Sequence, residues 1–140
     1  MISKADPHIH TNASDGFDNP EEIMDYIVMN TDFRIVAFSD HNTISGSLTA
    51  INYKKKHPLK FKHLDIIIAE EVSTKDGHII GLFLEHAIPP HMSAEETIKA
   101  IHSQGGIAVA PHPFNLILSS RGLEGVGKLF NRLPFDAVET

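Results

Sequence analysis

Ile35-Val36-Ala37-Phe38-Ser39 is a continuous apolar run that ends in Asp40-His41-Asn42. The run is too short for a typical helix and rich in branched residues, so it predicts a buried strand followed by polar side chains. Residues 107–110 repeat the pattern and are followed by Pro111-His112-Pro113. Buried strands of this kind are typical of parallel sheets, in which ligands bind at the carboxyl ends of the strands.

Capping residues and helical spacing predict helices between these strands. One helix begins at Asn19-Pro20-Glu21-Glu22, where an N-cap side chain precedes a proline and two acids. Residues 45–56 form a second helix, with Leu48 among the side chains expected to point inward. Ser93-Ala94-Glu95-Glu96 is a capping box that begins a third helix, which Gly105-Gly106 ends.

Further strands are expected at residues 2–11, 64–72, 77–84 and 135–140. The turn formers between the middle two favour a hairpin. The chain then alternates broadly as strand, helix, strand, helix, hairpin, helix, strand, helix and strand. This order predicts one α/β domain over residues 1–140 with a mainly parallel sheet.

The composition of the 140 residues excludes several classes of protein. Twelve Lys and Arg against 18 Asp and Glu leave a net charge of −6, which disfavours non-specific coating of nucleic acid. The absence of cysteine excludes disulfides and thiolate metal sites. The start shows no secretion signal and no eighteen apolar residues run together, so a cytoplasmic protein that does not bind a membrane is expected.

Ten histidines stand out, and several fall at the ends of expected strands. Asp6, His8 and His10 occupy alternate positions of a strand, so their side chains leave by one face. Together with carboxylates, converging imidazoles suit a borderline metal ion. More acids and histidines follow at or beside later strand ends: Asp40, His41, Glu70, Glu71, His78 and His112. Five other histidines lie beside Lys, Pro or Glu on helices or loops and are interpreted as solvated: His57, His63, His86, His91 and His102.

These motifs, in this order, resemble those of the PHP (polymerase and histidinol phosphatase) family over nearly the whole chain. The matching stretches are Asp6-Pro7-His8-Ile9-His10-Thr11 with Ser14-Asp15-Gly16, Ser39-Asp40-His41-Asn42, Glu71-Val72-Ser73 with Gly77-His78, and His112-Pro113. The resemblance implies a distorted (β/α)7 barrel related to the TIM barrel. It also implies two or three divalent metal ions, Zn, Mn or Fe, at the carboxyl ends of the strands.

Carried over by position, the resemblance implies a set of metal ligands: His8, His10, Asp15, His41, Glu71, His78 and His112. Glu71 is preferred to Glu70 because Val-Ser follows it, and neighbouring strand residues face opposite ways. Asp40 has three open roles, as a ligand, as an acceptor that orients His41, or in proton transfer. Asp6 is expected to act behind the ligands or as a secondary ligand.

Two departures from the family pattern matter. Pro7 removes a backbone donor from the first strand, which is tolerable only near the end of that strand. The family's last metal motif, an Asp-x-His pair near the end of the barrel, has no counterpart after His112 in this sequence. The simplest interpretation is that the sequence covers an incomplete N-terminal part of a barrel; the alternative is a chain that completes its sheet by association.

The function expected from this resemblance is hydrolysis of phosphate esters by a metal-activated water, with an ion absorbing charge on the phosphate oxygens. The substrate would be a small phosphate, a nucleotide or a nucleic-acid end. Arg121, after Ser119-Ser120, is the best candidate for a phosphate clamp, and a solvated loop arginine is its alternative. The competing function is a noncatalytic metal-binding or structural PHP module, or an inactive fragment.

Overall fold

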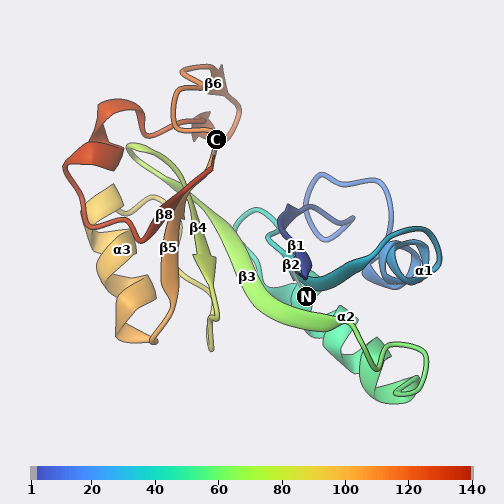
Figure 1. Cartoon of the computed structure of the whole chain (residues 1–140). Coiled ribbons are helices and arrows are strands. Elements are labelled where there is room, and N and C mark those ends of the chain that lie inside the picture. Colours follow the sequence, from blue (N-terminus) through green and yellow to red (C-terminus); the bar gives the residue numbers. More distant parts are fainter. Residues whose placement is uncertain (1–2, 140) are drawn as a thin grey trace.

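The computed structural model describes residues 3–139 and shows a mixed α/β fold around a curled sheet (Figure 1). Six strands form this sheet in the order β1-β2-β3-β4-β5-β8. Their bounds are β1 Lys4–Ile9, β2 Phe33–Phe38, β3 Asp65–Thr74, β4 Gly77–Leu82, β5 Ile107–Ala110 and β8 Ala137–Val138. The sheet curls like part of a barrel wall, which leaves β1 and β8 as its two edges.

The described sheet is mixed, with three parallel and two antiparallel strand pairs, and the hairpin predicted between residues 64–72 and 77–84 is confirmed. β1, β2 and β3 pair in parallel, and so do β5 and β8, but β4 is antiparallel to both of its neighbours. The reversal follows from the tight turn between Thr74 and Gly77, which can join only antiparallel strands. The beginning of β4 therefore lies at the same end of the sheet as the carboxyl ends of the parallel strands.

Three α-helices form where the sequence predicts them: α1 Pro20–Asn30, α2 Ser45–Lys56 and α3 Ala94–Ser103. Capping boxes begin α1 and α3, because Asn19 and Ser93 each accept a hydrogen bond from the backbone of a glutamate three residues later. Leu48 differs from expectation, since its side chain is 43% exposed on α2. Within residues 3–139, none of the helices has both the length and the apolarity needed to cross a bilayer.

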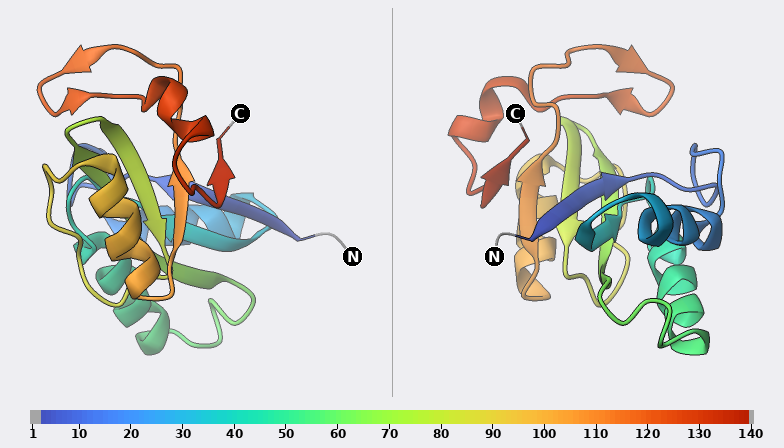
Figure 2. Two further views of the ribbon diagram at one scale, coloured as in Figure 1. Left: turned by 90° about the vertical axis from the view of Figure 1, so that its left-hand side faces the viewer. Right: turned by 45° about the vertical axis from the view of Figure 1, so that its right-hand side comes forward.

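The helices cover different parts of the sheet (Figure 2). α1 and α2 pack against β2 in a core that contains Met24, Phe38 and Phe61. On the other part of the sheet, α3 buries Ile98 and Ile101 in a separate core with β3, β4 and β5. A third, smaller apolar cluster joins four strands through residues that include Ala37, Ala69, Ile80 and Leu82. The two larger cores hold the strand ends in position.

Pro7 is accommodated because β1 is an edge strand that pairs only with β2 in the described sheet. The pairing of the two strands is irregular between Asp6 and Ile9, so the missing backbone donor of Pro7 breaks no regular ladder. The strand begins at Lys4; Ile2, which belonged to the expected strand, lies outside the described residues.

The segment between β5 and β8 does not form the α-helix expected there. It forms a small hairpin of β6 Leu118–Ser119 and β7 Gly122–Leu123, followed by the short 3-10 helix Gly127–Asn131. Gly122 and Gly127 have φ angles of 103° and 56°, left-handed conformations that favour glycine and that interrupt any α-helix running through this segment. The hairpin packs on β3 and β4 near the site that is described below.

A buried carboxylate ties the loop after β1 to the beginning of α2. Asp40 is fully buried and accepts hydrogen bonds from Thr11 N and Thr11 Oγ1, at 2.7 and 2.8 Å, and from Ser14 Oγ at 2.7 Å. Gly46 lies directly behind it, where an added Cβ would overlap Asp40 Oδ2 and lie 2.9 Å from Thr11 Oγ1. The close approach therefore requires glycine at this position of α2.

Replacing Gly46 by alanine is expected to destabilise the protein by about 1–3 kcal/mol, because the new methyl group must displace the buried Asp40 carboxylate. The higher helix propensity of alanine offsets at most about 1 kcal/mol of this loss. Urea unfolding measures the difference. Asn52→Ala, an exposed change on the same helix, is the control and should leave stability within about 0.5 kcal/mol. Equal stability of G46A and the unmodified chain would contradict the overlap.

Candidate metal centre

Glu71 lies at the centre of the site, on β3, with 1% of its surface exposed. Its backbone is tied to the loop after β2, because Glu71 N donates to Asp40 O and Asn42 N donates to Glu71 O, both at 3.1 Å. Glu70 points to the opposite side of the strand, where its carboxylate accepts a hydrogen bond from Ile88 N at 2.8 Å. The structure thus separates the two glutamates as strand alternation requires.

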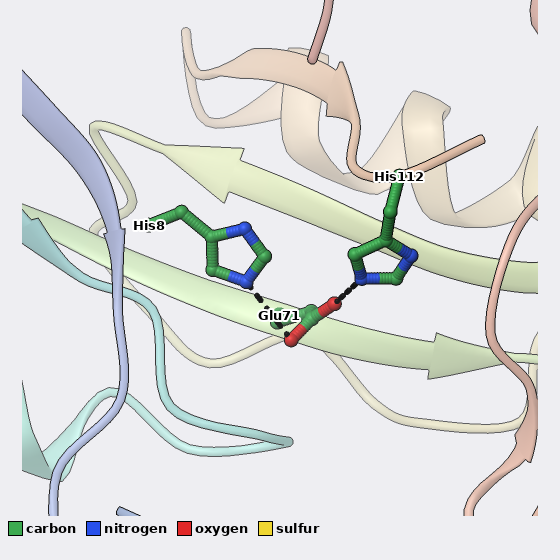
Figure 3. A group of neighbouring side chains, drawn as sticks. All are labelled: His8, Glu71 and His112. Carbon is green, nitrogen blue, oxygen red and sulfur yellow. Dashed lines mark hydrogen bonds and ion pairs between the residues drawn. The ribbon is translucent and has the colours of Figure 1, made fainter. Parts of the chain in front are cut away.

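Five imidazole rings surround the Glu71 carboxylate. The centroids of neighbouring rings lie 4.6 to 5.9 Å apart, and each ring contacts two others, so that the five rings form a closed circle. In order around the ring, the residues are His8, His10, His41, His78 and His112. Figure 3 shows how His8 from β1 and His112 from the loop after β5 point toward the carboxylate from opposite sides.

The strand ends bring these five histidines together from distant parts of the chain. His8 lies on β1 and His10 just beyond its end, His41 follows β2, and His78 is the second residue of β4. His112 follows β5 with a φ angle of 27°, a left-handed conformation that non-glycine residues seldom adopt. Pro113 further restricts this backbone, so the surrounding contacts must hold His112 in place.

Two charged residues extend the cluster toward its mouth. Asp15 contacts His10 Nδ1 at 2.7 Å and His41 Nε2 at 3.7 Å. Arg121, from the turn between β6 and β7, places Nη1 3.1 Å from Asp15 Oδ2. The hairpin therefore reaches across to the loop after β1, and its arginine is both 36% exposed and within contact of the cluster.

The charges of these groups are strongly coupled. Burial opposes ionisation of Glu71, but hydrogen bonds from the histidines, that from His10 being the largest, hold the pKa of its carboxyl far below the usual range. Burial likewise opposes protonation of His10, yet the hydrogen bonds to Glu71 and Asp15 outweigh it and raise the pKa to about 9. At His112 the hydrogen bond to Glu71 raises the pKa, whereas burial lowers the pKa of His41.

The donor set fits a divalent metal ion. Imidazole nitrogens and carboxylate oxygens are ligands of Zn, Mn and Fe. Three groups have ligand atoms within 4.8 Å of one another: His8 with Glu71 and His112, His10 with His41 and Glu71, and His78 with His112 and Glu124. His41 Nδ1 is buried, makes no hydrogen bond and lies 3.5 Å from Glu71 Oε2. A cation here would satisfy this nitrogen and replace the protons that the cluster attracts.

The structure gathers the seven residues that the sequence assigns as metal ligands into this one cluster and leaves other candidates outside it. The Asp40 carboxylate binds Thr11 and Ser14 rather than a ring nitrogen. Asp6 accepts a hydrogen bond from the backbone of His8 at 3.2 Å. The five histidines interpreted as solvated are all exposed.

Two acidic residues at the site were not found from the sequence. Glu139, after β8, places Oε1 3.2 Å from His8 Nδ1 and accepts a hydrogen bond from His112 N at 2.9 Å. Glu124, after β7, places Oε2 3.6 Å from His78 Nδ1. Neither belongs to a motif of the PHP resemblance. The position of Glu139 near the end of the expected strand 135–140 was the one available signal.

Sequence comparison finds relatives in an archaeon. Uncharacterized protein MJ1587 of Methanocaldococcus jannaschii is 35% identical over 153 residues, which cover 96% of this chain and 85% of the relative. This chain belongs to the same family as MJ1587. A second uncharacterized protein of that organism, MJ0417, is 30% identical over 113 residues, covering 81% of this chain and 40% of the relative. No family model matches the chain.

Several solved structures share the fold of this chain. One is a Bifidobacterium adolescentis protein that is assigned as a metal-dependent phosphoesterase by prediction. Its TM-score is 0.74 at 16% identity, and the matched region covers 99% of this chain and 77% of the Bifidobacterium chain. Another is an amidohydrolase from Chromobacterium violaceum, solved with sulfate and no metal. Its TM-score is 0.72 at 15% identity, and the matched region covers 97% of this chain and 76% of the amidohydrolase.

A two-domain Bacteroides vulgatus protein contains a predicted PHP-like metal-dependent phosphoesterase. Its TM-score is 0.66 at 18% identity, with 80% of this chain and 35% of that protein covered. This chain therefore spans about a third of the two-domain protein. These likenesses confirm the PHP-like fold that the motifs predict.

The metal-free protein is expected to lose the stabilising contribution of His10 as the pH rises. Folding raises the pKa of His10 from 6.5 to about 9, so the contribution is fully present below pH 6.5 and disappears as the pH passes through about 9. The shift corresponds to at most about 3 kcal/mol. Urea unfolding of the chain and of His10→Gln in a chelator should differ most below pH 6.5 and least above pH 9. A difference that is independent of pH would contradict the coupling.

Glu139→Ala is expected to weaken metal binding by about 10- to 100-fold, because the Glu139 carboxylate orients the ring of His8 and the backbone of His112. Glu139→Gln should lose less, since its amide oxygen can still accept from one of the two donors. Titration of the metal-free chain with Zn²⁺ measures both affinities. Glu85→Ala, an exposed change, is the control. Unchanged affinity in E139A would show that the two ligands are held without it.

Proposed function

We propose that this protein is a metal-dependent phosphoesterase. The observation that carries the proposal is the buried Glu71 carboxylate inside a closed ring of five imidazoles, at the strand ends of a PHP-like fold. Burying a carboxylate costs free energy, so such a group is weak evidence for a purely stabilising role. Surrounded by five imidazole nitrogens, it is suited to binding divalent metal ions. We assign the seven ligands expected from the sequence to two or three ions of Zn, Mn or Fe.

The chain's own residues would bind and orient these ions. Glu71 offers one oxygen to each side of the ring, and the histidines present neutral nitrogens once their protons are displaced. When bound, divalent ions lower the pKa of a water molecule and neutralise charge on phosphate oxygens. For Asp40, whose role the sequence left open among three alternatives, we propose a positioning role, because its oxygens hold Thr11 and Ser14 and thereby the loop that carries Asp15.

Arg121 is proposed to bind the phosphate of the substrate. Its guanidinium group lies at the mouth of the cluster, is partly exposed and pairs with Asp15. A phosphate group that enters the site could replace Asp15 as the partner of this guanidinium group. A single arginine at the mouth favours a small phosphorylated substrate. The net charge of −6 supports this substrate class over a nucleic-acid end, for which the contacts of the described residues add no support.

For the fold, we propose that residues 1–140 form the N-terminal part of a distorted (β/α)7 barrel. The support is a cavity of about 330 Å³ between the edge strands, lined by Pro7 of β1, Val138 of β8 and apolar side chains such as Leu82 and Val109. Apolar side chains that line a concave space between strands are typical of a barrel interior.

The proposal is tested by loading the metal-free chain with Mn²⁺, Zn²⁺ or Fe²⁺ and measuring hydrolysis of p-nitrophenyl phosphate. Turnover should depend on the metal, and His8→Ala or His10→Ala should reduce it by about 100-fold or more while circular dichroism stays unchanged. Arg121→Ala should raise KM for the phosphate ester without changing metal content. Retained activity in H8A and H10A would eliminate the proposed site.

The noncatalytic module predicts a different result. It would bind metal with the same histidines but would hydrolyse neither phosphate monoesters nor diesters. Near-stoichiometric metal without turnover across such a panel would therefore support the module, and metal-dependent turnover would exclude it.

A further inference from the structure

The two oxygens of Glu71 divide the ring of imidazoles into two halves. Oε2 faces three ring nitrogens: His8 Nε2 at 3.4 Å, His10 Nε2 at 2.9 Å and His41 Nδ1 at 3.5 Å. Oε1 faces two ring nitrogens, His78 Nδ1 at 3.2 Å and His112 Nε2 at 3.0 Å. One carboxylate thus serves two separate sets of donors, as a bridging ligand between two cations would.

Each half of the ring has a second carboxylate at its outer side. Asp15 accompanies the half at Oε2 through its contacts with His10 and His41. Glu124 accompanies the half at Oε1, where Oε2 of Glu124 lies 3.6 Å from His78 Nδ1. That distance is too long for a hydrogen bond but suits two ligands of a common ion. The donor atoms of His78, His112 and Glu124 all lie within 4.8 Å of one another.

The backbone holds Glu124 between the two histidines. His78 N donates to Glu124 O at 2.8 Å, and Glu124 N donates to Ile117 O at 3.0 Å. Gly125 packs so tightly on the other side that a Cβ would lie 2.5 Å from Pro113 O and 2.7 Å from His112 O. Glu124 is therefore placed by two strands and a loop, and the position does not depend on a flexible side chain alone.

We propose that Glu124 is a metal ligand, which completes a site with His78, His112 and Oε1 of Glu71. Two nitrogens and two carboxylate oxygens form a donor set for Zn, Mn or Fe. Charge balance supports the assignment, because a doubly charged ion in this half would otherwise have only a share of the Glu71 charge. The inference deepens the proposed function, on whose metal centre it rests, and Glu124 lies outside the motifs of the PHP resemblance.

The test is a calorimetric titration of the metal-free protein with Zn²⁺. Metal analysis after dialysis then gives the number of ions bound. The unmodified chain should show two classes of site. Glu124→Gln should weaken one class by at least about 10-fold and leave the other unchanged. His78→Ala should weaken the same class, and the double variant should lose little more than either single variant, since both remove ligands of one ion. His10→Ala should weaken the other class.

Glu85→Gln is the matched control, because it removes the same charge from an exposed position. If E124Q binds both classes as tightly as the unmodified chain while H78A loses one, Glu124 is not a ligand and the inference is wrong, although the proposed metal centre stands. Equal weakening of both classes in E124Q would also overturn it, because it would indicate a general electrostatic effect. A chain that binds no Zn²⁺ at all would refute the proposed function as well.

Discussion

The burial of one carboxylate organises the functional end of this molecule. Glu71 is almost completely enclosed, and an ionised group in such a place must be compensated by nearby positive charge or hydrogen-bond donors. Five imidazoles supply that compensation, and they come from four strands and the segments that follow them. The curl of the sheet, the reversed direction of β4 and the close packing of the strand ends are all needed for these rings to meet.

Polar anchors outside the ring fix the loops that carry its members. Asp40 holds the segment after β1 through Thr11 and Ser14, and Asn42 links the loop after β2 to β3 by exchanging two hydrogen bonds with Ser73. Glu139 joins the two edges of the sheet, because it follows the edge strand β8 and its carboxylate contacts His8 of the other edge strand, β1. It also accepts a hydrogen bond from the backbone after β5. Rigid anchoring of this kind is what a metal centre requires, since ligand positions must be set before an ion arrives.

The hairpin of β6 and β7 and the residue that follows it add two charged side chains to the site. The hairpin places Arg121 beside the half of the ring that contains Asp15, and the residue just after β7, Glu124, beside the other half. The solved structures share the fold at 15 to 18% identity, and a shared fold by itself does not carry these side-chain contacts from one protein to another.

Local patterns in the sequence were sufficient for three helices and for most strands, and the resemblance to the PHP family pointed to the seven side chains that the structure gathers into one cluster. The caps of α1 and α3, the buried strand 107–110 and the spacing of His8 and His10 are short-range features, which the chain determines within a few residues. The turn formers between β3 and β4 also predicted the antiparallel direction of β4. The exposure of Leu48 and the replacement of the last expected helix by a hairpin depended on tertiary packing and on glycine conformations. Glu124 and Glu139 gave no decisive signal, because a single glutamate acquires its role only when folding places it against a distant histidine.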